Sequence, residues 1–201
     1  REGRADYEAV ALAGINGTPL SRHVTFATGS HRTLGLTGPT GEVIRRGEPL
    51  STNIAYWGSN CCRAGWIASS AQDLPAAARD YVENFAGVYF EAMADWFAHL
   101  RVGASGDEIA RLIAKRLPYE RFGITLNPGH LIHLDEWVSS PIYLGSKLAL
   151  QSGMVVQADV IPFSAVYSSA RVEDGIVLAD AVLRNEIAER YPGCYQRCVA
   201  R

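Results

Sequence analysis

The sequence lacks three features that would each indicate a particular class of protein. The formal net charge of its 201 residues is −2, and no basic stripe runs along the chain, so nothing indicates nucleic-acid binding. No apolar run approaches the roughly 18 residues that a membrane-spanning helix needs. Residues 1–4 are polar and contain no apolar segment of the kind found in a secretory leader. These absences predict a cytoplasmic protein that binds neither nucleic acid nor a membrane.

Cysteine is also scarce, with four residues that form two close pairs, Cys61 with Cys62 and Cys194 with Cys198. Four cysteines in a chain of this length do not form a disulfide framework. A zinc site is disfavoured, because neither pair has C-x-x-C spacing and no histidine lies close to either pair in the sequence. We therefore predict reduced thiols, with Cys194 and Cys198 one helical turn apart.

The periodicity of apolar residues predicts a mixture of strands and helices. The segments with the character of strands are 23–28, 50–56, 61–69, 154–161, 164–173 and 175–179. The segments with the character of helices are 4–13, 74–100, 107–117 and 180–190. We expect a hairpin turn at 57–60, antiparallel pairing of the last two strands, and an end to the last helix at Pro192-Gly193. This arrangement predicts one domain of the α+β class with a curved antiparallel sheet.

Six short motifs, in order along the chain, resemble those of the creatinase/aminopeptidase superfamily, which includes methionine aminopeptidase, prolidase, aminopeptidase P and creatinase. The motifs are Gly47-Glu48-Pro49-Leu50, Tyr56–Arg63, Gly103–Glu108, Gly129-His130-Leu131-Ile132-His133-Leu134-Asp135, Leu150–Val156 and Arg171–Leu178. The resemblance implies a single domain over residues 1–201 with the pita-bread fold, in which two long helices and shorter helices accompany the curved sheet. Compared with that fold, the chain would lack the first helix and any N-terminal domain.

The metal enzymes of this superfamily hold two divalent ions with two Asp, one His and two Glu, because each ion needs oxygen ligands and charge neutralisation. The resemblance places His130 on the His ligand, Asp159 on the first Glu and Glu173 on the second. Asn60 stands in place of one Asp, and the other has no clear counterpart in residues 51–53. A neutral amide cannot bridge two cations. A divalent ion such as Mn, Co or Zn is therefore disfavoured, and we predict no metal cofactor.

Two further histidines of the peptidases have no match either, because they would align near Leu36 and Trp137. Creatinase, in contrast, hydrolyses a C–N bond without a metal, using His and carboxylates as acid and base. A carboxylate beside a histidine raises the pKa of the ring and orients it. We therefore predict catalytic roles for His130 as proton shuttle, Glu173 as substrate anchor or acid, and Asp159 as orienting partner.

Asn60, Arg63 and Arg171 are predicted to bind the substrate, although a structural ion pair is an equal alternative for both arginines. Three interpretations stay open. The first is a hydrolase that cleaves a C–N bond of a small amide or amidino compound without a dinuclear metal centre. The second is an inactive pita-bread protein that binds a ligand or peptide, and the third is a metallo-aminopeptidase or prolidase with unusual ligands. The resemblance also implies a small-molecule or short peptide substrate and a homodimer.

Overall fold

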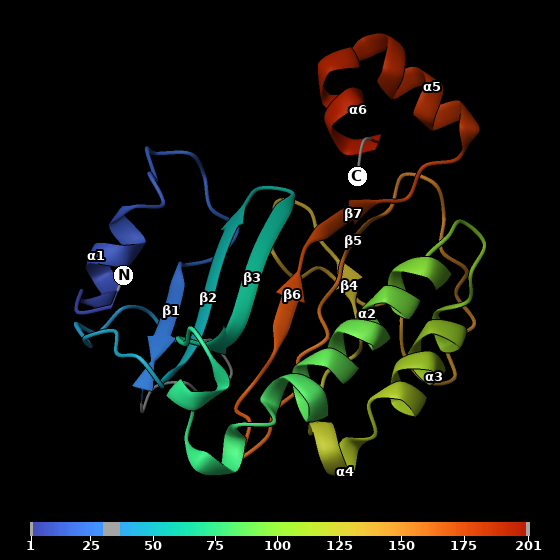
Figure 1. The fold of residues 1–201 in the computed structure, drawn as a ribbon. Helices are drawn as coiled ribbons and strands as arrows, with labels where there is room; N and C mark the ends of the chain where they lie inside the picture. Colours follow the sequence, from blue (N-terminus) through green and yellow to red (C-terminus); the bar gives the residue numbers. More distant parts are fainter. Residues whose placement is uncertain (1, 30–36, 200–201) are drawn as a thin grey trace.

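The computed structural model describes residues 2–29 and 37–199, in which helices and antiparallel strands alternate along the chain (Figure 1). The strands are β1 (Thr25–Thr28), β2 (Pro49–Tyr56), β3 (Ser59–Trp66), β4 (His130–Leu131), β5 (Val155–Gln157), β6 (Arg171–Glu173) and β7 (Gly175–Val177). The α-helices are α1 (Asp6–Ala11), α2 (Gly87–His99), α3 (Gly106–Arg116), α4 (Tyr119–Phe122), α5 (Ala181–Arg190) and α6 (Pro192–Val199). The α+β prediction is confirmed. No helix in these two described ranges is long and apolar enough to cross a membrane.

The strands form two sheets, a four-stranded one in the order β1-β2-β3-β6 and a three-stranded one in the order β4-β5-β7. The predicted β2–β3 hairpin is confirmed, with Tyr56 paired to Ser59 across a tight turn at Trp57-Gly58. Gly58 has φ +76, a conformation that glycine adopts without steric cost. The predicted pairing of segments 164–173 and 175–179 is wrong, because β6 pairs with β3 and β7 pairs with β5. Asp174 alone joins the two strands, which is too short for a hairpin turn, so the chain passes from one sheet into the other.

Two predicted helix boundaries also need correction. Two short 3₁₀ turns cover Ala71–Asp73 and Ala76–Ala78, and a π-helical turn over Val82–Ala86 leads into α2. One helix therefore does not span 74–100. The N–H of Gly87 bonds to the carbonyl of Val82, five residues back, and a Cβ on Gly87 would lie 2.7 Å from that oxygen. At the other end of the chain, Pro192 does not end the helical region but begins α6, because proline has no N–H to lose in a first turn.

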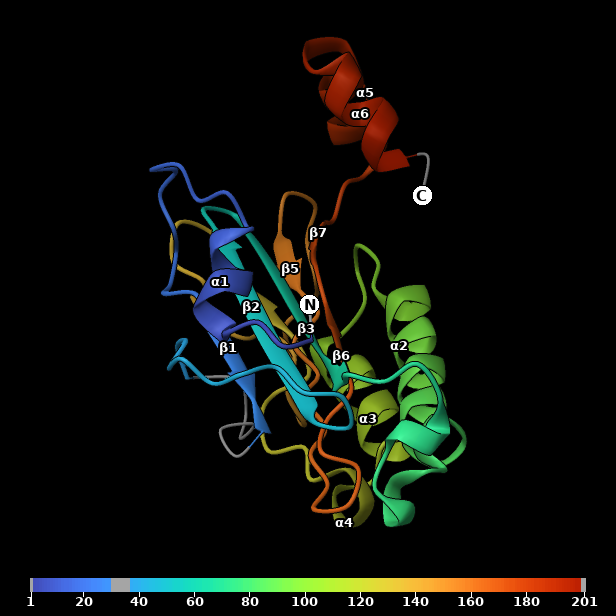
Figure 2. The same cartoon turned by 60° about the vertical axis from the view of Figure 1, so that its left-hand side comes forward.

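Helices α2 and α3 pack against one face of the sheets and form the main core with them (Figures 1 and 2). Trp96 of α2 is fully buried, and its indole N–H donates to the carbonyl of Pro128 at 2.8 Å. In the three-stranded sheet, Val156 lies in this core and its cross-strand neighbour Leu131 packs against it. His130 and its cross-strand partner Gln157 are each one residue away from the pair Leu131 and Val156 along their strands. Their side chains therefore point to the opposite face of the sheet. The fold therefore separates an apolar face under the helices from a polar face.

The C-terminal helices α5 and α6 stand apart from the helical layer of α2 and α3 (Figures 1 and 2). They follow β7 directly and pack against each other as a hairpin. No residue of α5 is buried, and Val182 on it is 77% exposed. This hairpin is therefore a peripheral feature of the fold.

Candidate functional site

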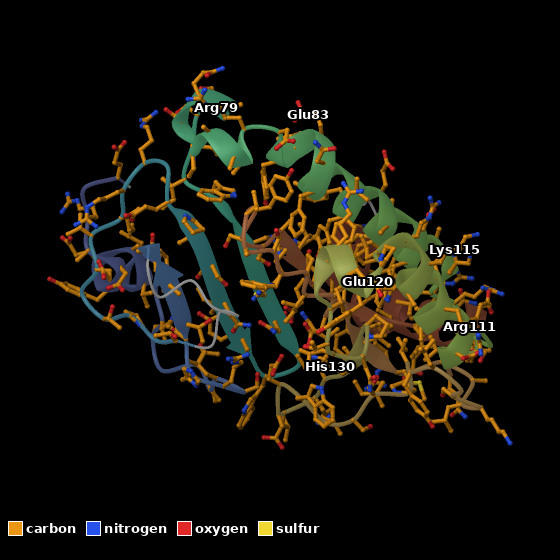
Figure 3. The ribbon with its side chains drawn as sticks, turned by 90° about the horizontal axis from the view of Figure 1, so that it is seen from below. Arg79, Glu83, Arg111, Lys115, Glu120 and His130 are labelled. Carbon is orange, nitrogen blue, oxygen red and sulfur yellow. The ribbon has the colours of Figure 1, made fainter. Side chains whose placement is uncertain are left out.

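A group of polar side chains meets on the face of the sheets opposite α2 and α3, and we call it the polar cluster. Its members are Asn60, His130, Glu136, Gln157, Asp159 and Glu173. Apart from Glu136, each is less than a tenth exposed. Figure 3 shows His130 beside the strands, whereas charged residues of the helical layer such as Arg111 and Lys115 lie at the edge of the molecule.

Strand register brings most of the cluster together. Glu173 lies opposite Cys62 on β3, two residues from Asn60 and on the same face. The amide of Gln157 joins the two sheets, because its Nε2 donates to the carbonyl of Asn60 at 3.1 Å and to Glu173 Oε1 at 3.3 Å. Asp159 follows β5, between Ala158 and Val160, which are both fully buried in the core. A charged side chain in this apolar segment therefore points away from the core and towards His130.

His130 has one ring nitrogen bound to the backbone and the other directed at carboxylates. Its Nδ1 lies 3.0 Å from the carbonyl oxygen of Leu131, so Nδ1 carries the proton. Its Nε2 lies 3.6 Å from Asp159 Oδ2 and 3.5 Å from Glu136 Oε1. Burial opposes protonation of the ring, but Glu136, the Leu131 carbonyl and the charge of Asp159 outweigh it, so the pKa of His130 lies above its ordinary value. The neighbouring carboxylates therefore stabilise a proton at Nε2.

Sequence reasoning missed two members of the cluster, Gln157 and the acidic residue Glu136. Glu136 Oε1 accepts from Asn60 Nδ2 at 3.0 Å, and its Oε2 lies 3.8 Å from Arg22 Nη1. Burial opposes its ionisation, but His130, Arg22 and Asn60 outweigh that effect and lower the pKa of Glu136. The sequence offered only an acidic pair, Asp135 and Glu136, after the His130 motif. Because both lie in a loop, no periodicity distinguished the half-buried Glu136 from the exposed Asp135.

Burial raises the pKa of both buried carboxyl groups, Asp159 and Glu173. Burial is the largest cause for Glu173, and the charge of Asp159 adds to it, so the pKa of Glu173 rises to about 8. Burial likewise raises the pKa of Asp159, although the charges of His130 and Arg171 oppose the rise. Asn60 Nδ2 donates to Glu173 Oε1 at 2.8 Å. At neutral pH, Glu173 is therefore an acid that can supply a proton.

The two arginines predicted to bind substrate occupy different places. Arg171 is 3% exposed and lies beneath the cluster, where its Nη1 is 3.4 Å from Ser51 Oγ and 3.5 Å from Cys62 Sγ. Arg63 points to the other face of the strand, where its guanidinium makes a bidentate pair with Asp174 at 2.8 and 3.0 Å. The structure thus brings Asn60, His130, Asp159, Glu173 and Arg171 together, but not Arg63.

The structure also bears on the residues that do not match the peptidases. Asn53 pairs with Cys62 across β2 and β3, so it shares a face with Asn60, and both are buried. The hairpin therefore presents two amides on this face. Trp137 is 58% exposed, and its ring centroid lies 6.1 Å from that of His130. Leu36 lies outside the described residues.

The side chains of the polar cluster can be compared with those needed to bind the pair of metal ions that the resemblance implies. His130, Asp159 and Glu173 offer three ligand atoms within 4.8 Å of one another, which is sufficient for one divalent ion. Two ions need bridging carboxylates, but Asn60 directs its N–H₂ group at Glu173 and Glu136, and an N–H donor cannot bind a cation. The residues present therefore do not fit a metal pair, and they can hold one ion at most.

Gly129 precedes His130 in a tightly packed place, and we expect Gly129→Ala to destabilise the fold by about 2 kcal/mol. Its φ of +122 is disfavoured for other residues, and a Cβ there would lie 3.0 Å from Trp96 Cζ2 and 3.2 Å from the carbonyl oxygen of Gln157. Gly145→Ala is the matched control, because Gly145 has φ +82 but a Cβ there meets no atom within 4 Å. Urea unfolding measures both variants, and equal losses would contradict the role of crowding at Gly129.

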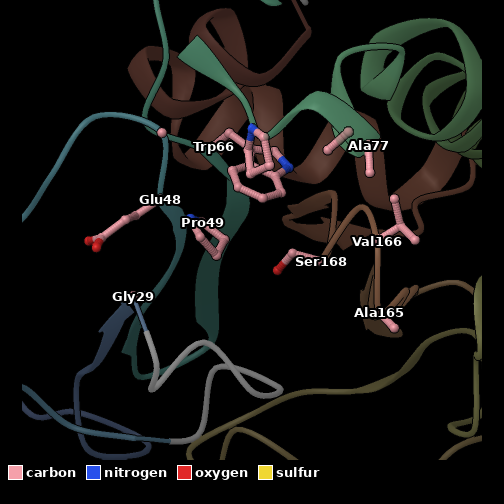
Figure 4. Close-up of a pocket in the computed structure, with 11 residues that line it drawn as sticks. Gly29, Glu48, Pro49, Trp66, Ala77, Ala165, Val166 and Ser168 are labelled. Atoms are coloured by element: carbon pink, nitrogen blue, oxygen red, sulfur yellow. The ribbon is translucent and has the colours of Figure 1, made fainter.

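A separate cavity of ≈ 500 Å³ lies near the other end of the hairpin (Figure 4). Its walls include Pro49 at the start of β2, Trp66 at the end of β3, and Ser168. The indole N–H of Trp66 donates to the carbonyl of Tyr167 at 3.0 Å, so this ring is held in place by the backbone. None of the residues described as lining this cavity belongs to the polar cluster, so the two are distinct features.

Comparison with known proteins relates this geometry to solved structures. No protein-family model matches the sequence, and no curated protein matches it. The structure is similar to an Xaa-Pro dipeptidase from Bacillus anthracis, with a TM-score of 0.72, 18% identity, and coverage of 89% of this chain and 51% of that one. It is also similar to an X-Pro aminopeptidase from Thermotoga maritima, with a TM-score of 0.71, 18% identity, and coverage of 90% and 52%. For a prolidase from Pyrococcus furiosus the TM-score is 0.67 at 18% identity, with coverage of 89% and 54%.

These matches show that the chain has the pita-bread fold, as the six motifs predicted. The chain spans about half the length of the solved structures that it matches. At 18% identity the likeness defines the fold alone.

Proposed function

We propose that this chain carries the site of a hydrolase that cleaves a C–N bond in a small amide or amidino compound, without a pair of metal ions. The observation that supports the proposal is the environment of His130. Its Nδ1 is bound to the Leu131 carbonyl, and its Nε2 lies within 3.6 Å of Asp159 and Glu136. Within the described part of the chain, Nε2 has no hydrogen-bond partner, so it is available to take a proton from water.

The proposed reaction balances with one water molecule. Water attacks the amide or amidino carbon while His130 takes one of its protons at Nε2. Asp159 and Glu136 stabilise the imidazolium that forms. The imidazolium then gives its proton to the leaving nitrogen, and the C–N bond breaks to release an amine and a carboxyl or amide product. Glu173, protonated at neutral pH, donates a hydrogen bond to the oxygen or nitrogen on which negative charge develops.

Within the described ranges, several buried hydrogen-bond acceptors on the face that carries the polar cluster have no donor, which supports a substrate that is rich in N–H groups. Among the described residues, the buried oxygens without a hydrogen-bond donor include Asn53 Oδ1, Asn60 Oδ1, Gln157 Oε1 and Asp159 Oδ1. A buried acceptor without a partner costs about 1–3 kcal/mol, so such atoms need a ligand or ordered water. Amidino and primary amide groups supply several N–H donors at once, whereas an ester supplies none.

The test is turnover after removal of metal. The protein would be dialysed against a chelator and assayed with a panel of small amides and guanidino acids, with the released amine or ammonia as readout. We expect release that persists in the chelator and does not increase when Mn²⁺, Co²⁺ or Zn²⁺ is returned. Binding of panel compounds without any release would instead support an inactive, ligand-binding protein.

A second candidate is a hydrolase that uses one divalent ion. The observation that favours it is the close approach of ligand atoms from His130, Asp159 and Glu173. The same assay separates the two candidates, because a one-metal enzyme would lose turnover in the chelator and regain it with one equivalent of ion per chain. The similarity to dipeptidases and aminopeptidases extends the panel to short peptides for this candidate.

A further inference from the structure

Helix α6 carries two cysteines on one side, Cys194 and Cys198, and the proposed hydrolase does not use them. All four cysteines of the chain are thiols, and both members of this pair are solvent-exposed. One helical turn separates the two, and their Sγ atoms lie 4.0 Å apart. The pair therefore presents two soft ligand atoms at a defined distance.

This distance suits a chelated ion better than a disulfide. In tetrahedral coordination with Zn–S bonds of about 2.3 Å, two thiolate sulfurs lie roughly 3.8 Å apart, close to the separation on α6. A disulfide needs sulfurs about 2.0 Å apart and Cβ atoms about 3.5–4.5 Å apart. Cβ atoms four residues apart in a helix are about 5–6 Å apart, so a disulfide would distort the last turns of α6.

The surroundings leave room for the rest of a coordination sphere. Both cysteines line a cavity of ≈ 640 Å³ whose walls also include Leu100 after α2, Leu178 after β7 and Ile187 of α5. Two protein ligands leave two positions of a tetrahedral ion open to water or a small external ligand. The polar cluster contributes no residue to this cavity, so the two sites differ in both place and chemistry.

The spacing in the sequence disfavours zinc, but the distance between the two sulfurs supports it, and we propose that Cys194 and Cys198 form a bidentate thiolate site for a soft or borderline divalent ion of the Zn²⁺ and Cd²⁺ class. On binding, the two thiols release two protons, two sulfur–metal bonds form, and the sulfurs displace water from the ion. No electron is transferred, so the step needs no oxidant. The proposal is independent of the proposed hydrolase.

The test is titration of the whole chain with Cd²⁺ in the presence of a phosphine reductant, followed by the ultraviolet charge-transfer absorption of cadmium thiolate. This band reports only sulfur ligands, so an ion at His130, Asp159 and Glu173 does not contribute. We expect the band to saturate at one Cd²⁺ per chain with release of two protons. Cys194→Ala and Cys198→Ala should each abolish saturable binding at the same concentrations.

Cys61→Ala is the matched control, because Cys61 is an exposed thiol far from α6 in sequence, and this variant should keep the full band. The proposal is overturned if no band appears, if the band survives Cys198→Ala, or if Cys61→Ala removes it. A count of two thiols instead of four, in protein purified without reductant and then unfolded, would overturn it in favour of a disulfide. Circular dichroism of the variants checks that α5 and α6 remain helical.

Discussion

His130→Gln is expected to lower turnover of any substrate that the chain cleaves by about 10²–10⁴-fold. The variant keeps a polar side chain of similar length but has no group that can hold a proton between Asp159 and Glu136. Because the loss concerns proton transfer, we expect it in kcat, with KM changed little. Steady-state kinetics on the best compound of the amide and guanidino panel measures both parameters.

His133→Gln is the matched control for this experiment. His133 lies three residues further along the same segment but is exposed, and its side chain belongs to no part of the polar cluster. We expect it to retain full turnover. Equal activity of the His130 and His133 variants would remove His130 from the reaction and leave only a structural role for it.

Glu173→Gln is expected to make the fold more stable than wild type at pH 8.5, by several kcal/mol, and to have little effect near pH 4. The pKa of Glu173 is raised by burial from 4.5 to about 8. Below pH 4.5 both the folded and unfolded states hold the proton. Between pH 4.5 and 8 only the folded state holds it, so wild-type stability falls as pH rises, by about 1.4 kcal/mol per pH unit. Glutamine does not titrate and accepts the same hydrogen bonds from Asn60 and Gln157.

Urea unfolding of chelator-treated protein from pH 4 to 9 measures this difference, and Asp6→Asn supplies a control of opposite sign. Burial opposes the ionisation of Asp6, but the backbone N–H groups of Thr40 and Gly41 outweigh it and lower the pKa of Asp6. The stability that Asp6 contributes is therefore present at neutral pH and is lost as pH falls through its lowered pKa. A difference between wild type and Glu173→Gln that does not grow with pH would contradict the raised pKa.

Local patterns in the sequence were sufficient for the main elements and for part of the site. Asp159 is predicted from the sequence as the partner of His130. The period of two residues in an extended chain places its carboxyl group on the side opposite Ala158 and Val160. Asp159 does lie on the opposite face, beside His130. The predicted helix over 107–117 corresponds to α3, and the hydroxyl of Ser105 caps its start by accepting from the N–H of Asp107.

Other features depend on contacts between distant segments and left no local signal. The segment that ends at Glu173 and the segment that begins at Gly175 look like neighbouring strands in the sequence. In the structure they belong to different sheets. Glu136 comes from a loop, where no period indicates which side chain turns inwards. Asn53 becomes a neighbour of Asn60 only through the register of the hairpin. Each of these outcomes is set by pairing and burial across the fold, which a single segment does not encode.

The sequence by itself therefore determined the order of the motifs, the α+β class and the replacement of a bridging Asp by Asn60. These are properties of residue identity and short-range periodicity. Only the tertiary structure decided that His130 lies between two carboxylates, that Arg63 is held by Asp174 outside the cluster, and that Glu173 is buried deeply enough for its pKa to rise. The physical reason is that proton affinity and ion pairing depend on the distance and burial of charges, and packing sets both when the strands come together.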